Sequence, residues 1–351
     1  IVFANILWPN DKLILAGSVI LSLIFALASY YFVESPARRL SFSSARGGLT
    51  AITSLAVLPL LVSSFAFVEA ESIDEMLGDP MALPVGYSLG CHGPDLSGGE
   101  LRVCTFDPPH KPDGKPPGNV YLVGDSHAAH YSSGLVIAAR KSNVQLQIVT
   151  ASSCPFLGLE AAYLSSDCDL WNSATLSHLL DSPPGTIVIG FSQVYFIGEE
   201  LFTLGGGEGV DFDTSVARLE KLQANLTSLA TKLKLYGHEL LVVIDVPRWE
   251  ADNSWQPARC TRWGLESGSC NATQLAADYL DRSSSLRRVI EYGEARELYE
   301  TLDFLSILCP QGVCSARSKE MLFYRDPAHL TNNFSESLAP IWESVIQESL
   351  S

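Results

Sequence analysis

Positive charge is scarce in this sequence of 351 residues, which has 23 lysines and arginines against 39 aspartates and glutamates, a formal net charge of −16 at pH 7. General nucleic-acid binding is therefore excluded, because affinity for polyanions depends on basic surface. Disorder of the whole chain is excluded too, since 47% of the residues are hydrophobic. The sequence also lacks an initial methionine and a signal peptide. We therefore expect it to be the C-terminal part of a longer protein.

Charge is absent altogether from two stretches near the N-terminus, Leu13–Val33 and Gly48–Val68, of 21 residues each. At about 1.5 Å per residue, a helix of that length crosses a hydrocarbon core of about 30 Å. The sequence therefore predicts two transmembrane helices, at about 13–33 and 48–68. A pair of buried core helices is the alternative.

The loop between these stretches predicts which side of the membrane the rest of the chain occupies. It holds three arginines (Arg38, Arg39 and Arg46) and one acidic residue, Glu34. Short basic loops stay in the cytoplasm, so residues 69–351 are expected outside. The charge divides accordingly, because residues 1–68 carry a net +2 and the remaining 283 residues a net −18.

Cysteine is missing from the first 68 residues, although the chain has eight. An even set on one side of a membrane predicts disulfides in an oxidising compartment. Eight cysteines allow 105 connectivities, but these fall into four pairs that are close in sequence. We predict Cys91–Cys104, Cys154–Cys168, Cys260–Cys270 and Cys309–Cys314. A zinc site is the alternative for the last pair, but no metal is expected, since zinc sites need tighter pairs with histidine partners.

The outer part divides into a linker and an α/β domain. Residues 69–118 are rich in Pro, Gly and acid, which indicates a linker. From residue 119, apolar strand-like runs alternate with helical patterns, which predicts a parallel sheet covered on both faces. The expected strands are 120–123, 146–150, 186–189, 240–244 and Phe304–Leu308. The expected helices are 128–141, 170–180, 214–235, 272–302 and 335–350.

The first of these strands runs directly into Gly124-Asp125-Ser126-His127. Functional sites of parallel sheets form at the carboxyl ends of strands. A serine at the start of the following helix gains from its free N–H groups, which can hold an oxyanion. The alternative is that Ser126 only caps the helix.

A second polar string lies near the C-terminus, where Asp326 and His329 are three residues apart. On a turn or at a helix start, this spacing puts both side chains on one side. Asp326 can then hold one imidazole nitrogen while the other accepts a proton from a serine hydroxyl. An exposed loop histidine with an unrelated aspartate is the alternative.

Together, Gly-Asp-Ser and Asp-x-x-His in this chain order resemble the SGNH (GDSL-like) esterase and acyltransferase family, from Gly124 to His329. The upstream string 31–39 (YFVESPARR) resembles the end of the membrane acyltransferase 3 family. The combination resembles the fused subgroup, which joins a membrane acyltransferase domain to an SGNH domain. It implies a three-layer flavodoxin-like fold with about five parallel strands.

By that resemblance, Ser126 is the nucleophile, His329 the general base and Asp326 its orienting partner. Gly124, Asp125 and His127 are then candidates for oxyanion or substrate contacts, although His127 is more typical of packing at a helix start. The family's Gly and Asn donors have no direct match here. Ser153, after the second strand, and Gln193, after the third, are the candidates in their place.

The resemblance further implies an O-acyltransferase, most often an O-acetyltransferase, that modifies a bacterial surface glycan such as lipopolysaccharide O-antigen. It implies residues 1–68 as the end of the membrane domain, 69–118 as a periplasmic linker and 119–351 as the catalytic domain at the inner membrane. No cofactor is expected on this chain, and acetyl-CoA would supply the acyl group through the membrane domain that precedes it. The expected partners are the glycan acceptor, the lipid bilayer and that membrane domain.

Two alternatives remain open at this point. The same triad serves a carbohydrate esterase that removes acetyl groups, or the chain is a tethered glycan-binding module without catalysis. Five aromatic residues are candidates for a sugar-stacking platform, although aromatics near helices are more often core. They are Trp171, Tyr195, Trp249, Trp255 and Trp263.

Overall fold

The computed structural model describes residues 12–35, 61, 64, 79, 81–93, 101–109, 118–157, 166–197, 215–249, 255, 257, 260 and 270–349. The chain divides into two compact units, which we describe separately. One comprises residues 1–75 and 259–270, and the other comprises residues 76–258 and 271–351.

The first unit contains helix α2 (Lys12–Ser29), which continues as the π-helical turn η1 (Tyr30–Glu34). Large apolar side chains along α2, such as those of Leu23 and Phe25, are exposed. Within the described parts of the chain, no helix combines the length and the apolar character needed to cross a membrane. The predicted span at 13–33 is helical but not supported as a span. The one at 48–68 lies outside the described residues, apart from Leu61 and Ser64.

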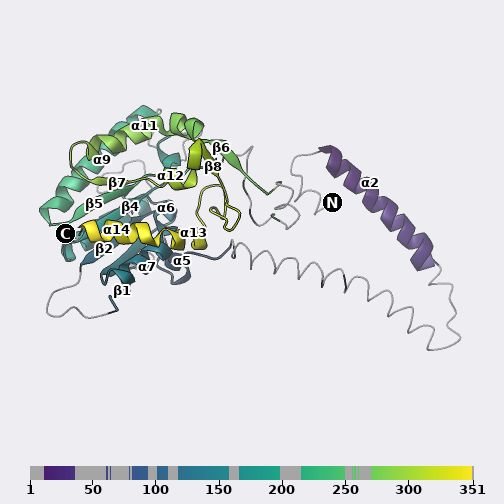
Figure 1. Cartoon of the computed structure of the whole chain (residues 1–351), viewed down its shortest axis with the longest axis horizontal. Helices are drawn as coiled ribbons and strands as arrows, with labels where there is room; N and C mark the ends of the chain where they lie inside the picture. Colours follow the sequence, from purple (N-terminus) through teal and green to yellow (C-terminus); the bar gives the residue numbers. More distant parts are fainter. Residues whose placement is uncertain are drawn as a thin grey trace. The chain divides into compact units, whose positions relative to one another are not determined.

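The second unit is built on a six-stranded sheet in the order β1-β3-β2-β4-β5-β7 (Figure 1). Strands β2, β3, β4, β5 and β7 are parallel, and β1 (Cys104–Phe106) is antiparallel at the edge. The five parallel strands therefore follow the order 2-1-3-4-5 of flavodoxin-like folds, as predicted. Their bounds are Asn119–Gly124, Gln145–Thr150, Thr186–Gly190, Glu239–Val243 and Glu300–Leu302.

The prediction of a strand at Phe304–Leu308 is wrong. Leu305–Leu308 form a helical turn, α12, and the last parallel strand is β7, just before it. The Asp303 carboxylate accepts the Leu305 N–H at 2.8 Å, which satisfies a free donor at the helix start. Short apolar runs fit a strand and a buried helix equally well by periodicity. The structure shows that this run forms a helical turn.

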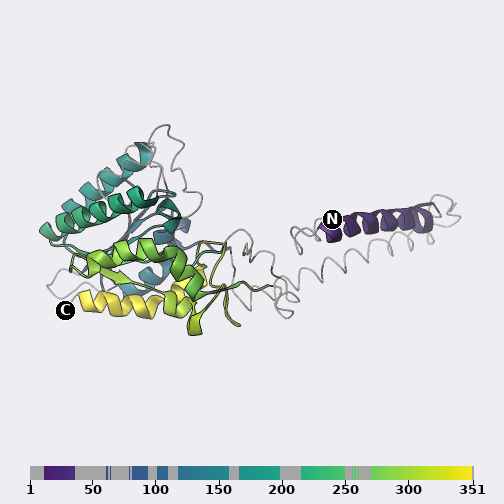
Figure 2. The same ribbon diagram turned by 90° about the horizontal axis from the view of Figure 1, so that it is seen from above.

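Helices cover both faces of the sheet, as Figures 1 and 2 show. On one face α7 packs against α13 and α14, and on the other α9 packs against α11. The expected helix at 128–141 is divided into α6 and α7, and the one at 272–302 is shorter because its ends form β6 and β7. The bounds are α6 Ser126–Ala129, α7 Ser132–Lys141, α8 Ser166–Asp181, α9 Ser215–Leu235, α11 Ala276–Glu294, α13 Asn332–Ser337 and α14 Ala339–Ser349.

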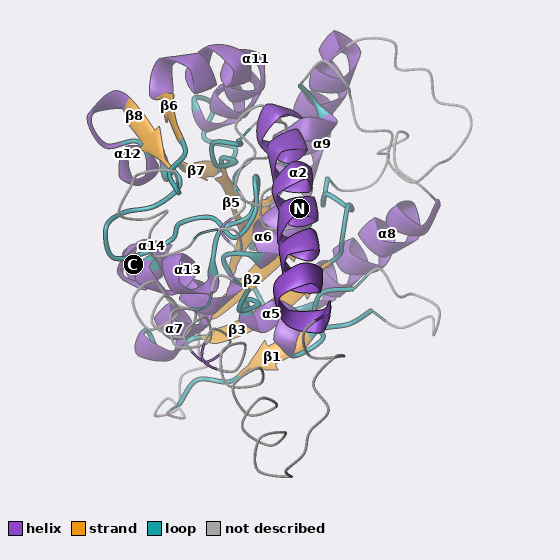
Figure 3. Ribbon diagram, turned by 90° about the vertical axis from the view of Figure 1, so that its right-hand side faces the viewer, coloured by secondary structure: helices purple, strands orange, loops and turns teal. Residues whose placement is uncertain are grey.

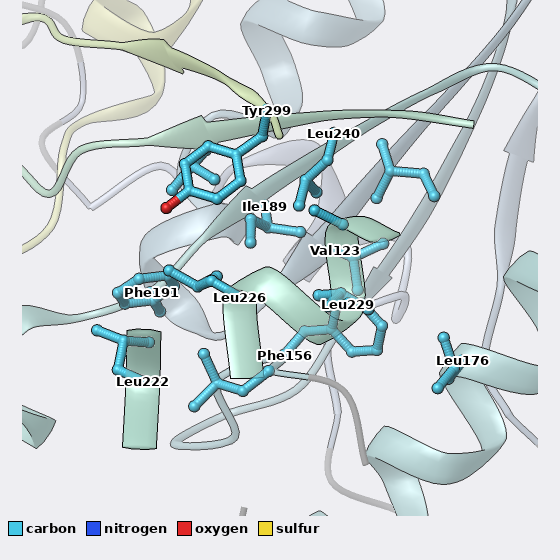
Figure 4. Packing of buried hydrophobic residues seen from close by; sticks show 14 of the residues in the cluster. Val123, Phe156, Leu176, Ile189, Phe191, Leu222, Leu226, Leu229, Leu240 and Tyr299 are labelled. Carbon is cyan, nitrogen blue, oxygen red and sulfur yellow. The ribbon is translucent and has the colours of Figure 1, made fainter. Parts of the chain in front are cut away.

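The hydrophobic core between the sheet and α8, α9 and α11 fixes the strand ends in place. Side chains of β2, β4 and β5 meet a row from α9, as Figure 4 shows. Both faces of the strands are buried, which is the reason that they read as continuous apolar runs. The labelled members include Val123, Ile189, Leu240, Leu222, Leu226 and Leu229.

Part of the predicted linker belongs to the sheet and its surroundings. β1 (Cys104–Phe106) pairs with β3, and the short helix α5 (Val85–Ser88) lies against α7. The hydroxyl oxygens of Ser132 and Ser133 accept the N–H groups of Gly86 and Val85, each at 3.0 Å. Residues 85–93 and 101–106 are thereby fixed to the domain rather than free of it.

All four disulfides join the cysteines that the sequence analysis paired. Cys91–Cys104 fastens the segment after α5 to β1, and Cys154–Cys168 joins the loop after β3 to α8. Cys309–Cys314 closes the turn η6 (Pro310–Gly312) onto β8 (Val313–Ser315). β8 pairs with β6 (Thr273–Leu275) in a separate ribbon beside α12 (Figure 3).

Candidate active site

Ser126 is the first residue of α6, and only Asp125 separates it from the end of β2. The bend between them requires a glycine, because Gly124 has a φ of +144° and a Cβ there would lie 2.0 Å from the Gly190 carbonyl oxygen. Asp125 is fully buried and caps α6, accepting the His127 N–H at 2.7 Å and the Ser192 N–H at 2.9 Å. Ser126 is thus held at the carboxyl end of β2, where β3 and β4 flank that strand.

His329 and Asp326 lie in the loop before α13 and complete a hydrogen-bonded line with Ser126. One Asp326 oxygen accepts the backbone N–H groups of Ala328 and His329, both at 2.8 Å. His329 Nδ1 lies 2.8 Å from Asp326 Oδ2, and His329 Nε2 lies 2.8 Å from Ser126 Oγ. Residues 203 positions apart in sequence therefore meet in the geometry of a nucleophile, a base and an orienting carboxylate.

The electrostatics of these two residues suit proton transfer near neutral pH. Burial would raise the pKa of Asp326, but the hydrogen bonds and charge of His329 lower it to about 2. Burial lowers the pKa of His329, and the nearby positive charges of His127 and Arg325 lower it further against the opposing effect of Asp326. An ionised Asp326 can accept the Nδ1–H of a neutral His329, whose Nε2 then faces the serine hydroxyl.

His127 is buried in the interior rather than turned to an open surface. Its Nδ1 lies 2.6 Å from Asp245 Oδ1, and its ring centroid lies 4.8 Å from that of His329. Asp245 also accepts the N–H groups of Val246 and Gln193, both at 2.9 Å. His127 is buried, and its role as an oxyanion or substrate contact stays a prediction. The sequence analysis missed Asp245, although a polar residue just after a buried parallel strand is a signal of a site.

The two remaining oxyanion candidates lie after the strands that flank β2. Ser153 follows β3 with a left-handed φ of +57°, a backbone conformation that glycine adopts more readily. Gln193 opens the 3-10 turn η2 (Gln193–Tyr195) after β4, and its backbone N–H is bonded to Asp245. Both residues stand at the same edge of the sheet as Ser126. Their role as oxyanion donors stays a prediction.

His92 is a second site residue that the sequence analysis missed, because it lies in the predicted linker. Its Nδ1 is 3.0 Å from Thr150 Oγ1 and its Nε2 is 2.7 Å from Ser152 Oγ, at the carboxyl end of β3. The Tyr87 ring packs on it with centroids 4.0 Å apart. Burial, with the charges of His329 and Arg325, lowers the pKa of His92 to about 4. This segment therefore forms one side of the site.

The aromatic residues considered for a sugar-stacking platform belong to the core. Trp171, Tyr195, Trp249 and Trp255 are all buried, with at most 4% of their surface exposed. A buried ring offers no face to a sugar, so the platform is wrong for these four. Trp263 lies outside the described residues.

The parallel sheet in the order 2-1-3-4-5, with a serine, a histidine and an aspartate at its carboxyl edge, defines the SGNH class of enzymes that act on acyl groups. The profile of one protein family, described as SGNH domain (fused to AT3 domains), matches residues 90–344. The chain belongs to this family.

Solved structures that resemble the chain do so at low sequence identity. The periplasmic domain of a Salmonella ser. Paratyphi A lipopolysaccharide acetyltransferase is 16% identical, with a TM-score of 0.43 over 66% of this chain and 84% of the other. A GDSL-like lipase of Bacteroides thetaiotaomicron is 11% identical, with a TM-score of 0.37 over 66% and 88%. A salicylyl-acyltransferase of a tetracycline biosynthetic pathway is 15% identical, with a TM-score of 0.37 over 69% and 56%. No curated protein matches the sequence.

Proposed function

We propose that the chain is an O-acyltransferase that carries an acetyl group on Ser126 and transfers it to a hydroxyl of a bacterial surface glycan, such as lipopolysaccharide O-antigen. The observation that carries the proposal is the unbroken line from Ser126 Oγ through His329 to Asp326, with both contacts at 2.8 Å. A serine acting only as a helix cap would need no imidazole on its hydroxyl. The capping bond of α6 comes from Asp125 instead.

In the first half of the reaction, Ser126 Oγ attacks the acyl carbonyl while His329 Nε2 takes the hydroxyl proton. Asp326 stabilises the resulting imidazolium through Nδ1. The Ser126 N–H, with Ser153 and Gln193 as further candidates, would hold the oxyanion. When the tetrahedral intermediate collapses, His329 returns its proton to the leaving oxygen or sulfur, which leaves an acetyl ester on Ser126.

In the second half, the glycan hydroxyl takes the position of the leaving group. His329 accepts its proton as its oxygen attacks the ester carbonyl, and then returns the proton to Ser126 Oγ. The acetyl group ends on the glycan, and the enzyme is regenerated. The strong acidity of residues 69–351, with a net charge of −18, favours a neutral sugar over a phosphate-rich acceptor.

The acyl group is proposed to come from acetyl-CoA through a membrane acyltransferase region, since the family consists of SGNH domains fused to such domains. In this arrangement residues 1–68 end the membrane region at the inner membrane. The catalytic domain lies in the periplasm and comprises residues 119–351 together with α5 and β1 from the predicted linker at 69–118. The exposed apolar side chains of α2 support this placement, because such a surface is unfavourable in water.

A carbohydrate esterase is the second candidate, favoured by the exposure of the site. The side chains of His329 and Asp326 are 23% and 40% exposed, so water can reach the acyl-enzyme. Hydrolysis and transfer share the first half-reaction and differ only in the acceptor. A comparison of acetate release with transfer to an added oligosaccharide separates the two. A glycan-binding module would bind the oligosaccharide and do neither.

The test is the Ser126→Ala variant of the purified chain, with p-nitrophenyl acetate as the acyl donor. We expect turnover to fall by about 10³-fold or more, because no nucleophile remains. Ser344→Ala, which removes an exposed hydroxyl from α14, is the matched control and should keep full turnover. Undiminished turnover in Ser126→Ala would contradict the proposal.

A further inference from the structure

Two histidine–aspartate pairs lie side by side at the carboxyl edge of the sheet. His127–Asp245 is the buried pair, with 6% and 4% of the two side chains exposed and 2.6 Å between Nδ1 and Oδ1. The rings of His127 and His329 are 4.8 Å apart between centroids. The proposed mechanism gives His127 and Asp245 no part, yet a buried pair of titratable groups is costly to keep without a role or a compensating network.

Asp245 is held by more contacts than its histidine alone supplies. Its two carboxylate oxygens accept backbone N–H groups of Val246 and Gln193, each at 2.9 Å. Tyr279 of α11 donates its hydroxyl to the Asp245 carbonyl oxygen at 2.5 Å. Groups from three elements therefore fix this aspartate, so that the position of His127 is determined as well.

The charged and titratable groups facing His127 come from every element around it. Asp125 and His130 are on its own turn, Asp245 and Arg248 follow β5, and His329 is in the loop before α13. Burial would lower the pKa of His127, but the carboxylates of Asp245 and Asp125 outweigh it, and the pKa is raised. Burial and the charges of its neighbours hold the pKa of His130 well below the ordinary value.

We propose that His127, fixed by Asp245, is a positioning residue that acts through His329. It places one positive charge beside the His329 ring. This charge keeps His329 unprotonated in mildly acidic surroundings, so that it can accept the Ser126 proton. Like charges in contact disfavour each other strongly where water is excluded. The pair is thus a permanent electrostatic support for the neutral state of the base. This inference rests on the proposed function, because it assigns His329 the role of base.

The consequence is testable in the acid side of the pH–activity profile. In Asp245→Asn, His127 loses its counter-ion and becomes neutral, so His329 should protonate at higher pH. In His127→Gln the positive charge is gone while the Asp245 carboxylate stays, so the shift should be larger in the same direction. In each of these two variants, kcat with p-nitrophenyl acetate should be several-fold lower at mildly acidic pH than the kcat of the same variant at pH 8.

His130→Asn is the matched control, since His130 is a buried neutral ring in the same cluster. Its Nδ1 accepts the Leu330 N–H at 3.5 Å, which an asparagine oxygen can replace. The decrease of kcat at acidic pH should be unchanged in this variant. A purely structural role for His127 would lower kcat by the same factor at every pH, in which case the proposal is wrong.

Charge states can be read directly from the imidazole nitrogen shifts of the whole chain with labelled histidine, of which the sequence has seven. At pH 7 we expect one histidine with both nitrogens protonated, whose signal disappears in His127→Gln. A neutral His127 at pH 7 would overturn the proposal. This measurement needs no substrate, so it fails independently of the proposed function, which the Ser126→Ala assay tests.

Discussion

The pairs His329–Asp326 and His127–Asp245 are chemically the same but differ in their access to water. The side chains of the first are 23% and 40% exposed, and those of the second 6% and 4%. The pKa of the more exposed histidine is lowered, with burial the largest cause, whereas the carboxylates around the buried one outweigh burial and raise its pKa. The same two residue types can therefore provide a proton carrier in one place and a fixed charge in another, according to their surroundings.

Exchanging each aspartate for asparagine is expected to give the largest effects and to separate the two roles. Asp326→Asn should lower kcat by roughly 10³–10⁴-fold with a small loss of stability, because the imidazole loses its orienting carboxylate. Asp245→Asn should lower the free energy of unfolding by about 3 kcal/mol, because a buried partner of His127 loses its charge. Its loss of kcat at pH 8 should be far smaller. Activity assays and urea unfolding on both variants measure the contrast.

An equal loss of kcat in both variants at pH 8 would break the distinction between a proton-carrying pair and a supporting one. An equal loss of stability in the two variants would also contradict this distinction, because it would mean that access to water does not determine the roles of the two pairs. The two substitutions are isosteric, so each serves as the control for the other.

The bend at Gly124 positions Ser126, which contacts His329, and His127, which belongs to the buried pair. Gly124→Ala adds a methyl group 2.0 Å from the Gly190 carbonyl oxygen at a φ of +144°. We expect it to destabilise the fold by about 3 kcal/mol or more through backbone strain and overpacking. Both the activity and the charge state of His127 should be disturbed. Thermal unfolding and the histidine spectrum report these effects.

Gly90→Ala is the matched control for that substitution. Gly90 also has a positive φ, +73°, but a Cβ there meets no atom within 4 Å. Only the cost of the left-handed backbone remains, about 1 kcal/mol. If the two variants lost the same stability, the close approach of β2 and β4 would not be what fixes the bend.

The catalytic candidates could be predicted because their signals are local in sequence. Asp326 and His329 are three residues apart, and Ser126 follows an apolar strand within a Gly-Asp-Ser string. The parallel strands were predictable for the same reason, since continuous apolar runs identify buried strands. The prediction of a strand at Phe304–Leu308 failed because a short apolar run fits a strand and a helical turn equally well by periodicity.

The contacts of the supporting residues could not be predicted, because their partners are distant in the chain. Asp245 meets His127 across 118 positions, and His92 meets Thr150 across 58. Neither residue lies in a recognisable string, and composition assigned His92 to a linker. These residues become neighbours because the sheet order brings the ends of β2, β3, β4 and β5 together. The topology was predicted, but the pairing of particular side chains at its edge depends on tertiary packing.

His92 offers the smallest and most specific test. It is a histidine beside the site whose contacts are with Thr150, Ser152 and Tyr87, none of which is a carboxylate. Its pKa is lowered to about 4 in the folded chain, from an ordinary value of 6.5. As the pH falls from 6.5 toward 4, the unfolded chain binds a proton that folded His92 does not, so stability is lost over this window. After allowance for solvent screening, the loss should be about 1 kcal/mol.

His92→Gln should flatten the decline in stability over that pH window, because glutamine does not titrate. Urea unfolding at a series of pH values measures the slope. Ser152→Ala removes the hydrogen bond to His92 Nε2 but leaves the ring able to titrate, so it should lower stability at every pH and keep the slope. If His92→Gln kept the wild-type slope, other groups would cause the acid sensitivity. The lack of a carboxylate partner at His92 would then not explain why stability falls at acidic pH.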